Sequence, residues 1–188
     1  MKDPLGFTTS IVHSDRMDVI EHGSLHKPIH TTVAYGYEDA NELAGVFQGT
    51  NAGYSYGRQV NPTVSALETK INRMEKGIAS VCFSTGMAAI GTMLFALLRR
   101  GDHFVSSSFL FGNTNSLFQS FEVHGIEVSF VDATDVQAVE RAVRPETKLV
   151  FVETIANPRT QVSDLRRIGD FCRHNNLVYV VDNTMTSP

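Results

Sequence analysis

Three short segments of this chain carry polar groups that could bind a small charged ligand. Ser84-Thr85-Gly86-Met87 precedes an apolar helical pattern, and the free N–H groups of a helix N-terminus bind phosphate. Asn157 offers a side-chain amide, and Asp182 offers an isolated carboxylate after an apolar run. Together these groups would suit a phosphorylated pyridine ring, because the carboxylate would keep the ring nitrogen protonated and make the ring an electron sink. Each signal is weak alone, since caps and turns of these types are common.

The elements that must position these segments are short β-rich runs alternating with amphipathic stretches from about Thr63 onward. Several runs are apolar almost throughout, which is typical of strands covered on both faces. The predicted strands are residues 79–83, 102–105, 126–131, 148–152 and 177–181. The helical patterns between them start at signals such as Asn61-Pro62, with Ser163 as a candidate cap of the last helix, and they end at Gly or Pro.

Strand and helix alternate at intervals of roughly 22 to 29 residues, which predicts repeated βαβ units with right-handed crossovers and a largely parallel sheet. Ligands of such α/β sheets bind beyond the carboxyl ends of the strands. The three polar segments are therefore expected at one rim. Residues 1–60 lack this rhythm because Gly and Pro break every periodic stretch, and they predict an extended arm with at most short helices. The predicted organisation is an arm at 1–60 and the first part of a large α/β domain at 61–188.

Six blocks of the sequence follow one another in an order and spacing shared with one enzyme family. The blocks are YGRQVNPT at 56–63, STGMAAI at 84–90, GDH at 101–103, FGNT at 111–114, ETIANP at 153–158 and VDNTMTSP at 181–188. From about Pro28 onward the chain resembles the Cys/Met-metabolism, cystathionine γ-synthase-like family of pyridoxal-phosphate (PLP) enzymes. The resemblance implies the fold-type-I α/β architecture and PLP as the cofactor, and it covers only the N-terminal portion of such an enzyme.

The resemblance also implies roles for individual residues of the ring site. Asp182 is similar to the partner of the pyridinium nitrogen, and Asn157 to the group that binds the phenolic oxygen of the ring. Gly86 and Met87 resemble the backbone ligands of the phosphate. Glu153 is also in the family pattern, and both a structural and a functional role are open for it.

Two further positions bear on assembly and on the reaction. Tyr56 and Arg58 match the pair that reaches the phosphate of the neighbouring subunit in this family, which implies a homodimer with shared sites, doubled to a homotetramer. The planar fork of an arginine suits a phosphate dianion. Phe111 stands where many members have a tyrosine that stacks on the ring, so the ring face is kept and the hydroxyl is lost. In this the chain resembles the O-succinylhomoserine and O-acetylhomoserine sulfhydrylases more than the lyases.

Such an enzyme needs a lysine that holds the cofactor as a Schiff base and moves protons. Lys2 and Lys27 lie in the arm, Lys70 and Lys76 lie on the helix after Asn61, and Lys148 opens a strand at the end opposite the expected rim. None is placed to reach the cofactor, and in the family the lysine would fall beyond Pro188. We therefore expect no catalytic residue within these 188 residues and no activity of this piece alone.

Composition excludes several other classes of function. The net charge of -4 and scattered arginines argue against nucleic-acid binding. No apolar run of about 18 residues and no secretory start occur, which predicts a cytoplasmic protein without a membrane span. His22, His26 and His30 have helical spacing, but Gly23 and Pro28 interrupt it, so no metal site is predicted.

The function predicted for the full-length protein is γ-replacement on an O-acylhomoserine by sulfide or a thiol, giving homocysteine or cystathionine in methionine biosynthesis. A same-family alternative is γ- or β-elimination from methionine or cystathionine. An alternative of another class is a non-catalytic module that binds a ligand or partner without turnover. The sequence alone leaves these three open.

Overall fold

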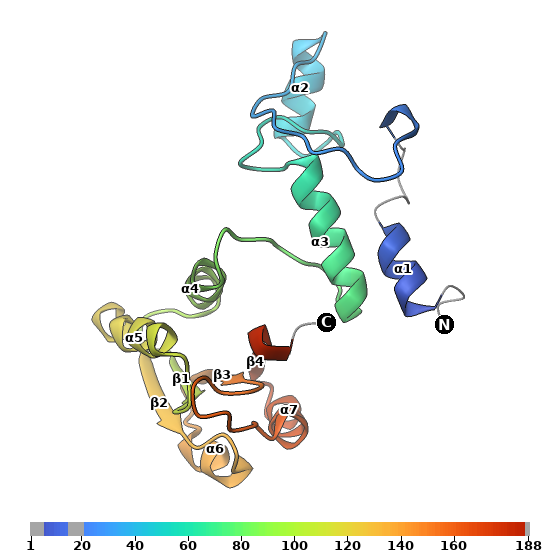
Figure 1. Ribbon diagram of the computed structural model, residues 1–188. Helices are drawn as coiled ribbons and strands as arrows, with labels where there is room; N and C mark the ends of the chain where they lie inside the picture. The colour runs from blue at the N-terminus through green and yellow to red at the C-terminus, as the bar shows by residue number, and fades with distance from the viewer. Residues whose placement is uncertain (1–5, 15–20, 187–188) are drawn as a thin grey trace. The chain divides into compact units, whose positions relative to one another are not determined.

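The computed structural model describes residues 6–14 and 21–186 of the 188. These residues divide into two compact units, with the boundary between Cys82 and Phe83 (Figure 1). Each unit is described by itself below. Lys2 and the last two residues of the block at 181–188 lie outside the described residues.

The first unit combines helices with extended segments. Its helices are α1 (Phe7–His13), the 3₁₀ turn η2 (Glu21–Gly23), α2 (Ala40–Phe47) and α3 (Pro62–Glu75). The predicted start of α3 is confirmed, because the Asn61 side chain accepts hydrogen bonds from the N–H groups of Thr63 and Val64 and Pro62 opens the helix. Lys76 ends α3 in the left-handed region, with φ 52°.

Two extended segments of the arm pair with each other just before α3. The N–H of Tyr35 donates to the carbonyl of Ser55 at 3.1 Å, and the N–H of Gly57 donates to the carbonyl of Val33 at 2.6 Å. A Cβ atom on Gly57 would lie 3.3 Å from the carbonyl oxygen of Thr32. A side chain here would crowd the facing backbone, and the glycine avoids this crowding.

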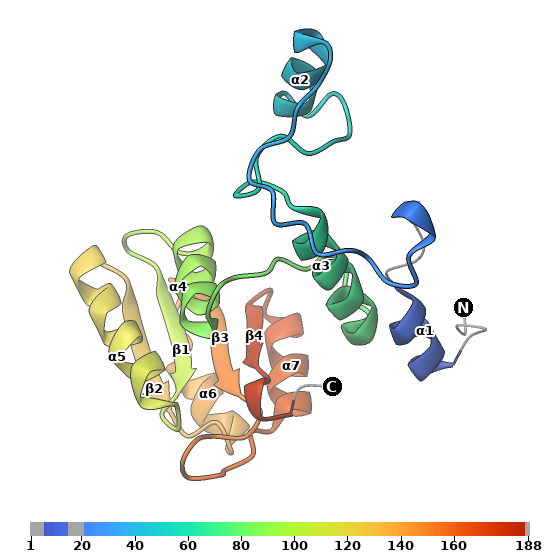
Figure 2. The ribbon, with the colours of Figure 1, turned by 45° about the horizontal axis from the view of Figure 1, so that its top comes forward.

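The second unit is a parallel sheet of four strands. The strands are β1 (His103–Ser107), β2 (Glu127–Val131), β3 (Thr147–Glu153) and β4 (Val178–Asp182), and they lie side by side in the order β2-β1-β3-β4 (Figure 2). All three strand pairs are parallel. The predicted α/β architecture with a parallel sheet is confirmed.

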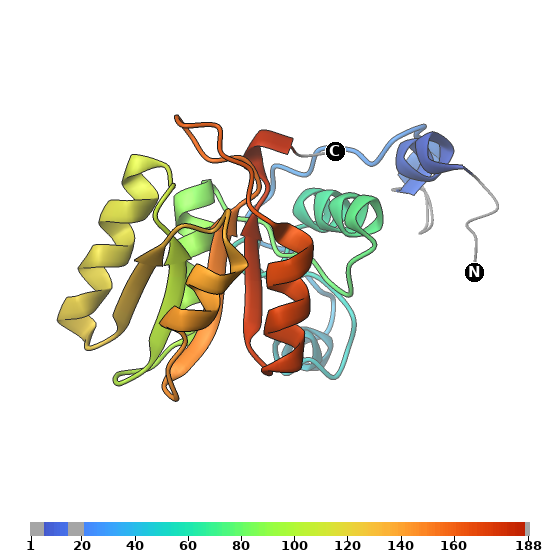
Figure 3. The same cartoon turned by 90° about the horizontal axis from the view of Figure 1, so that it is seen from below.

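Helices cover both faces of this sheet. They are α4 (Gly86–Leu97), α5 (Gly112–Ser120), α6 (Val136–Ala142) and α7 (Leu165–His174), with 3₁₀ turns η3 (Phe121–His124) and η4 (Thr184–Thr186). Helices α6 and α7 lie together on one face (Figure 3), and α4 and α5 lie on the other. Helix α5 connects β1 to β2, at one edge of the sheet. On the opposite face, α6 connects β2 to β3 and α7 connects β3 to β4, so the chain advances toward the other edge. All three crossovers thus have the same hand, as expected for parallel strands.

Alternation along the strands divides the apolar side chains between two cores. Leu149 and Phe151 of β3 pack on the face covered by α4 and α5, together with Leu94 and Phe118. Val150 and Val152 point to the opposite face and pack on α6 and α7. Because side chains of a strand alternate between faces, the next residue in the Leu149–Phe151 series, Glu153, belongs to the α4 face.

One predicted strand does not form in the described part of the chain. Residues 79–83 have extended backbone but no ladder partner there, and Val81 is 72% exposed. The N–H of Cys82 instead donates to the Glu68 side chain at 2.9 Å. A β-rich run becomes a strand only when a neighbouring strand accepts its hydrogen bonds, and the prediction of a strand at this place was wrong for these residues.

The predicted cap of α7 was also wrong by one residue. Asp164, not Ser163, occupies the cap position, and its side chain accepts from the N–H of Arg167. The hydroxyl of Ser163 points inward and donates to the backbone carbonyl of Glu153 at 2.7 Å. A buried hydroxyl needs a hydrogen-bond partner, and here the end of β3 provides it.

None of the helices in residues 6–14 and 21–186 is long and apolar enough to span a membrane.

Candidate cofactor site

The first part of the site is the N-terminus of α4. Thr85 caps this helix, since its hydroxyl accepts from the N–H of Ala88 at 3.0 Å and its carbonyl accepts from the N–H of Ala89 at 3.1 Å. The N–H groups of Gly86 and Met87 precede these bonds and have no partner among the described residues. A Cβ atom on Gly86 would have no neighbour within 4 Å, so the space in front of this end is open. Free N–H groups and the positive end of the helix dipole form a site for an anion.

The second part is a pair of carboxylates at the carboxyl ends of β3 and β4. Glu153 and Asp182 are partners in the parallel register, so their side chains project from the same face of the sheet, the face of α4. Oδ1 of Asp182 accepts both from the N–H of Thr184 at 2.9 Å and from its hydroxyl at 2.6 Å. Oδ2 of Asp182 accepts no hydrogen bond from the described residues and is left for a ligand.

Glu153 differs from Asp182 because each of its two carboxylate oxygens accepts a hydrogen bond from a backbone N–H. The side chain is 5% exposed; Oε1 accepts from the N–H of Phe111 at 2.8 Å and Oε2 accepts from the N–H of Asn157 at 3.3 Å. Burial raises the pKa of this carboxyl, the nearby charge of Asp182 adds to the rise, and the two N–H donors oppose it. Glu153 thus joins the loop after β1 to the loop after β3.

These groups surround one cavity of about 310 Å³. It is lined by Thr85, Gly86, Met87, Ile90, Phe111, Thr114, Glu153, Ile155, Asn157, Asp182, Thr184 and Met185. Five residues predicted from the sequence are brought together here: Gly86, Met87, Phe111, Asn157 and Asp182. The cavity offers unpaired N–H donors for a phosphate, a free carboxylate oxygen for a ring nitrogen and an aromatic face for stacking. This donor set fits a phosphorylated pyridine ring.

Sequence reasoning missed several lining residues. Thr184 is the most informative of them, because its two hydrogen bonds fix the Asp182 carboxylate. The signal that could have found it is the spacing Asp-x-Thr after a strand, which recurs at Asp132 and Thr134, where the same two bonds form. Ile90 and Ile155 add apolar walls.

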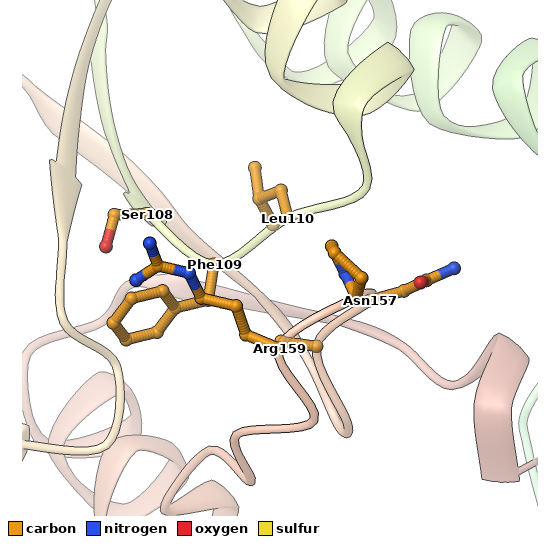
Figure 4. Close-up of a pocket in the computed structure, with 7 residues that line it drawn as sticks. Ser108, Phe109, Leu110, Asn157 and Arg159 are labelled. Carbon is orange, nitrogen blue, oxygen red and sulfur yellow. The ribbon is translucent and has the colours of Figure 1, made fainter.

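A second cavity of about 380 Å³ is lined by the loops after β1 and β3, and Asn157 belongs to the lining of both cavities (Figure 4). Asn157 and Arg159 point in opposite directions from this loop. The guanidinium of Arg159 lies over the ring of Phe109, 5.8 Å from its centroid. This contact adds to the tie between the loops after β1 and β3.

The remaining predicted residues, Tyr56 and Arg58, belong to the first unit. The guanidinium carbon of Arg58 lies 5.0 Å from the centroid of the Tyr56 ring, and both residues line a cavity of about 430 Å³ in that unit. Lys148 is the lysine of the second unit, and its Nζ lies 3.9 Å from Oδ1 of Asp102 at the amino end of the sheet. It is therefore at the end opposite the cavity, as predicted.

The fold and the cavity together define a class of protein: a parallel α/β domain with a cavity suited to a phosphorylated ring beyond the carboxyl ends of its strands. Comparison with known families narrows this class. The family model described as Cys/Met metabolism PLP-dependent enzyme matches residues 8–188. The chain belongs to this family, and its cofactor is pyridoxal phosphate.

The individual relatives include both a lyase and a sulfhydrylase. The chain is 35% identical to the L-methionine gamma-lyase of Fusobacterium nucleatum, over 97% of this chain and 47% of that protein. It is 44% identical to the O-acetylhomoserine sulfhydrylase of Wolinella succinogenes, with a TM-score of 0.65 over 68% of this chain and 36% of that one. A second similar structure is a putative O-acetylhomoserine (thiol)-lyase from Campylobacter jejuni that carries a pyridoxyl-lysine adduct (26% identity, TM-score 0.85, 93% of this chain and 43% of that one). The chain thus spans less than half of each of these relatives.

Proposed function

We propose that the full-length protein catalyses γ-replacement on an O-acylhomoserine, in which sulfide or a thiol displaces the acyl group to give homocysteine or cystathionine. The relatives support PLP-dependent chemistry on sulfur amino acids. The observation that favours replacement over elimination is the phenylalanine at position 111.

Phe111 contributes an aromatic face to the cavity and no acid. Its side chain is 46% exposed and lines the cavity. Tyr179 is the tyrosine of the second unit, and it packs on the α6 and α7 face of the sheet, away from the cavity. Elimination from methionine or cystathionine releases a thiolate, which leaves more easily when an acid protonates it. The carboxylate released from an acylated homoserine is a much weaker base and needs this help less.

The other residues of the cavity have roles consistent with the family's cofactor. The N–H groups of Gly86 and Met87 would donate to the phosphate, the Phe111 ring would stack on the pyridine ring, and the Asn157 amide would bind the phenolic oxygen. Oδ2 of Asp182 would hold a proton on the ring nitrogen. When bound, PLP supplies an electron sink for the negative charge that develops on substrate carbons.

The assembly and the missing lysine complete the proposal. Tyr56 and Arg58 would reach the phosphate of a neighbouring subunit, so that the protein works as a homodimer with shared sites, doubled to a tetramer, in the cytoplasm. The Schiff-base lysine would come from a segment other than residues 1–188, because Lys148 of the sheet unit lies at the wrong end. On this proposal the 188 residues alone are inactive.

The test compares substrates on the full-length protein. We expect kcat/KM for O-acetyl- or O-succinylhomoserine with sulfide to exceed that for methionine or cystathionine by at least about 10²-fold, within the range credited to one general acid. Phe111→Tyr should narrow this gap, chiefly by raising lyase turnover, and Phe109→Tyr in the neighbouring cavity is the matched control that should leave the ratio unchanged.

Two outcomes would favour the rival functions. Wild-type lyase activity equal to or above the replacement activity would identify the protein as an elimination enzyme, the alternative that the likeness to L-methionine gamma-lyase favours. Retention of PLP without turnover of any of these substrates would favour a non-catalytic ligand-binding module.

A further inference from the structure

Glu153 occupies a position that the roles proposed above leave unused. Glu153 is 5% exposed as a residue, and its carboxylate forms no ion pair with a Lys, Arg or His side chain of the described residues. Its partners are two backbone N–H groups, one from Phe111 and one from Asn157. A buried carboxylate is costly to desolvate, and hydrogen bonds from N–H groups are what offsets that cost here.

The two N–H groups belong to two different loops. Phe111 follows β1 and precedes α5, and it lies 42 residues before Glu153 in the sequence. Asn157 follows β3 and lies 4 residues after Glu153. Glu153 ends β3, so the rigid sheet fixes its Cα. One side chain anchored in the sheet therefore sets the backbone positions of the residue that would stack on the ring and of the residue that would bind its phenolic oxygen.

We propose that Glu153 is a positioning residue of the PLP site, which holds Phe111 and Asn157 on two sides of the ring through its two carboxylate oxygens. It acts through these residues and does not itself touch the reacting atoms. The inference rests on the proposed placement of PLP in this cavity and not on the identity of the substrate.

The charge state of Glu153 is part of this role. The ionised carboxylate accepts both N–H groups, whereas a protonated carboxyl turns one oxygen into a donor that faces an N–H. The pKa of Glu153 is raised by burial and by Asp182, the charged neighbour on the adjacent strand. Lowering the pH should therefore loosen the two loops at a pH above the ordinary range of a glutamate.

The experiment measures PLP binding to the full-length apoenzyme of wild type and Glu153→Gln. The glutamine keeps the shape and one acceptor, but its NH₂ group faces the second N–H. We expect the Kd for PLP to rise by about tenfold or more, the size of effect credited to a lost hydrogen bond to a charged group. Glu140→Gln, an exposed position on α6, is the matched control and should bind PLP as the wild type does.

A second readout separates positioning from a general role in folding. The ratio of the Kd of Glu153→Gln to that of wild type should shrink as the pH falls, because protonation of Glu153 makes the wild type resemble the variant. The phosphate of PLP titrates in the same way for both proteins, so its effect cancels in the ratio. The melting temperature of the apoenzyme variant should stay within a few degrees of wild type, since removing a buried charge while keeping its volume relieves a desolvation cost.

An unchanged PLP Kd in Glu153→Gln, or a ratio that does not vary with pH, would overturn the inference. If the variant apoenzyme melts far below wild type and loses PLP equally at all pH values, Glu153 serves folding only, and the inference is also wrong. Failure of the proposed reaction would look different: the wild type would bind PLP with the expected dependence on Glu153 but would not turn over O-acylhomoserines.

Discussion

Replacing Asp182 by asparagine in the full-length protein tests the placement of the ring nitrogen. The N–H and the hydroxyl of Thr184 both donate to Oδ1, at 2.9 and 2.6 Å. The amide oxygen of the variant must take this position, because an NH₂ group there would face two donors. The NH₂ group would then take the place of Oδ2 and face the ring nitrogen in the proposed placement of PLP. A donor in this position cannot hold a proton on that nitrogen.

The size of the effect follows from the lost charge. Two unit charges about 3 Å apart attract by about 5.5 kcal/mol at an effective dielectric of about 20, and the amide forfeits this attraction while keeping the loop in place. Allowing half of it for solvation of the ion pair leaves about 2.7 kcal/mol, which corresponds to a loss in kcat of about 10²-fold. PLP retention and the melting temperature should change little.

The structure offers a closely matched control for this variant. Asp132 directly follows β2 and begins the same Asp-x-Thr motif, and its Oδ1 accepts from the N–H and hydroxyl of Thr134 at 2.9 and 2.6 Å. Asp132→Asn should therefore reproduce any local effect on an Asp-x-Thr turn without touching the cavity. The assay is steady-state turnover of both variants beside PLP content. Near-normal kcat in Asp182→Asn, or an equal loss in Asp132→Asn, would refute the reasoning.

Two further predictions concern the stability of the sheet unit in the full-length protein. Thr85→Ala removes the cap of α4, so it should lower the free energy of unfolding by about 1 kcal/mol and weaken PLP binding. Thr85→Ser keeps a hydroxyl and should restore both properties. Equal stability of wild type and both variants in denaturant titrations would contradict this prediction. Burial and Arg144 lower the pKa of His103 in the folded protein. As the pH falls below the ordinary value of 6.5, the histidine of the unfolded chain therefore binds a proton before that of the folded chain. The free energy of unfolding then falls by at most about 1.4 kcal/mol per pH unit. The melting temperature of His103→Gln should thus fall less between pH 7.5 and 5.5 than that of wild type, and parallel curves would remove His103 from this role.

The sequence predicted most of the elements because local patterns decide them. The apolar runs around Phe104, Val128, Val150 and Val180 became neighbouring parallel strands. Asn61 and Pro62 mark the start of α3 through bonds within three residues of the cap. The run at 79–83 failed because strand formation depends on a partner elsewhere, which no local pattern reveals.

The site was predicted to a different degree. The motif positions of Gly86, Met87, Phe111, Asn157 and Asp182 indicated which residues gather at one cavity, because the carboxyl ends of parallel strands meet at one rim. The role of Glu153 could not be read in the same way. Its bond to Phe111 joins residues 42 positions apart, and it depends on the register between strands and on the path of a loop.

The two ends of the sheet explain why the ligand should bind where it does. At the amino end, the polar groups are satisfied within the protein. Thr147 Oγ1 accepts from the N–H of Arg144 at 2.7 Å, which leaves its hydroxyl hydrogen to donate to Nδ1 of the buried His103 at 2.7 Å. His103 then carries its proton on Nε2 and donates it to Ser129 Oγ, 2.9 Å away. A neutral histidine with both ring nitrogens bonded has no capacity left for a ligand.

The carboxyl end is built in the opposite way. The N–H groups of Gly86 and Met87, Oδ2 of Asp182 and the side-chain amide of Asn157 have no hydrogen-bond partner among residues 6–14 and 21–186, yet they surround one cavity. These groups lie at an open rim, where water or a ligand can complete their hydrogen bonds. Glu153, in the same place, uses both of its oxygens to hold the backbone. The carboxyl end therefore separates two tasks: Glu153 fixes the geometry, and the groups around it are left available for a phosphate, a ring nitrogen and a phenolic oxygen.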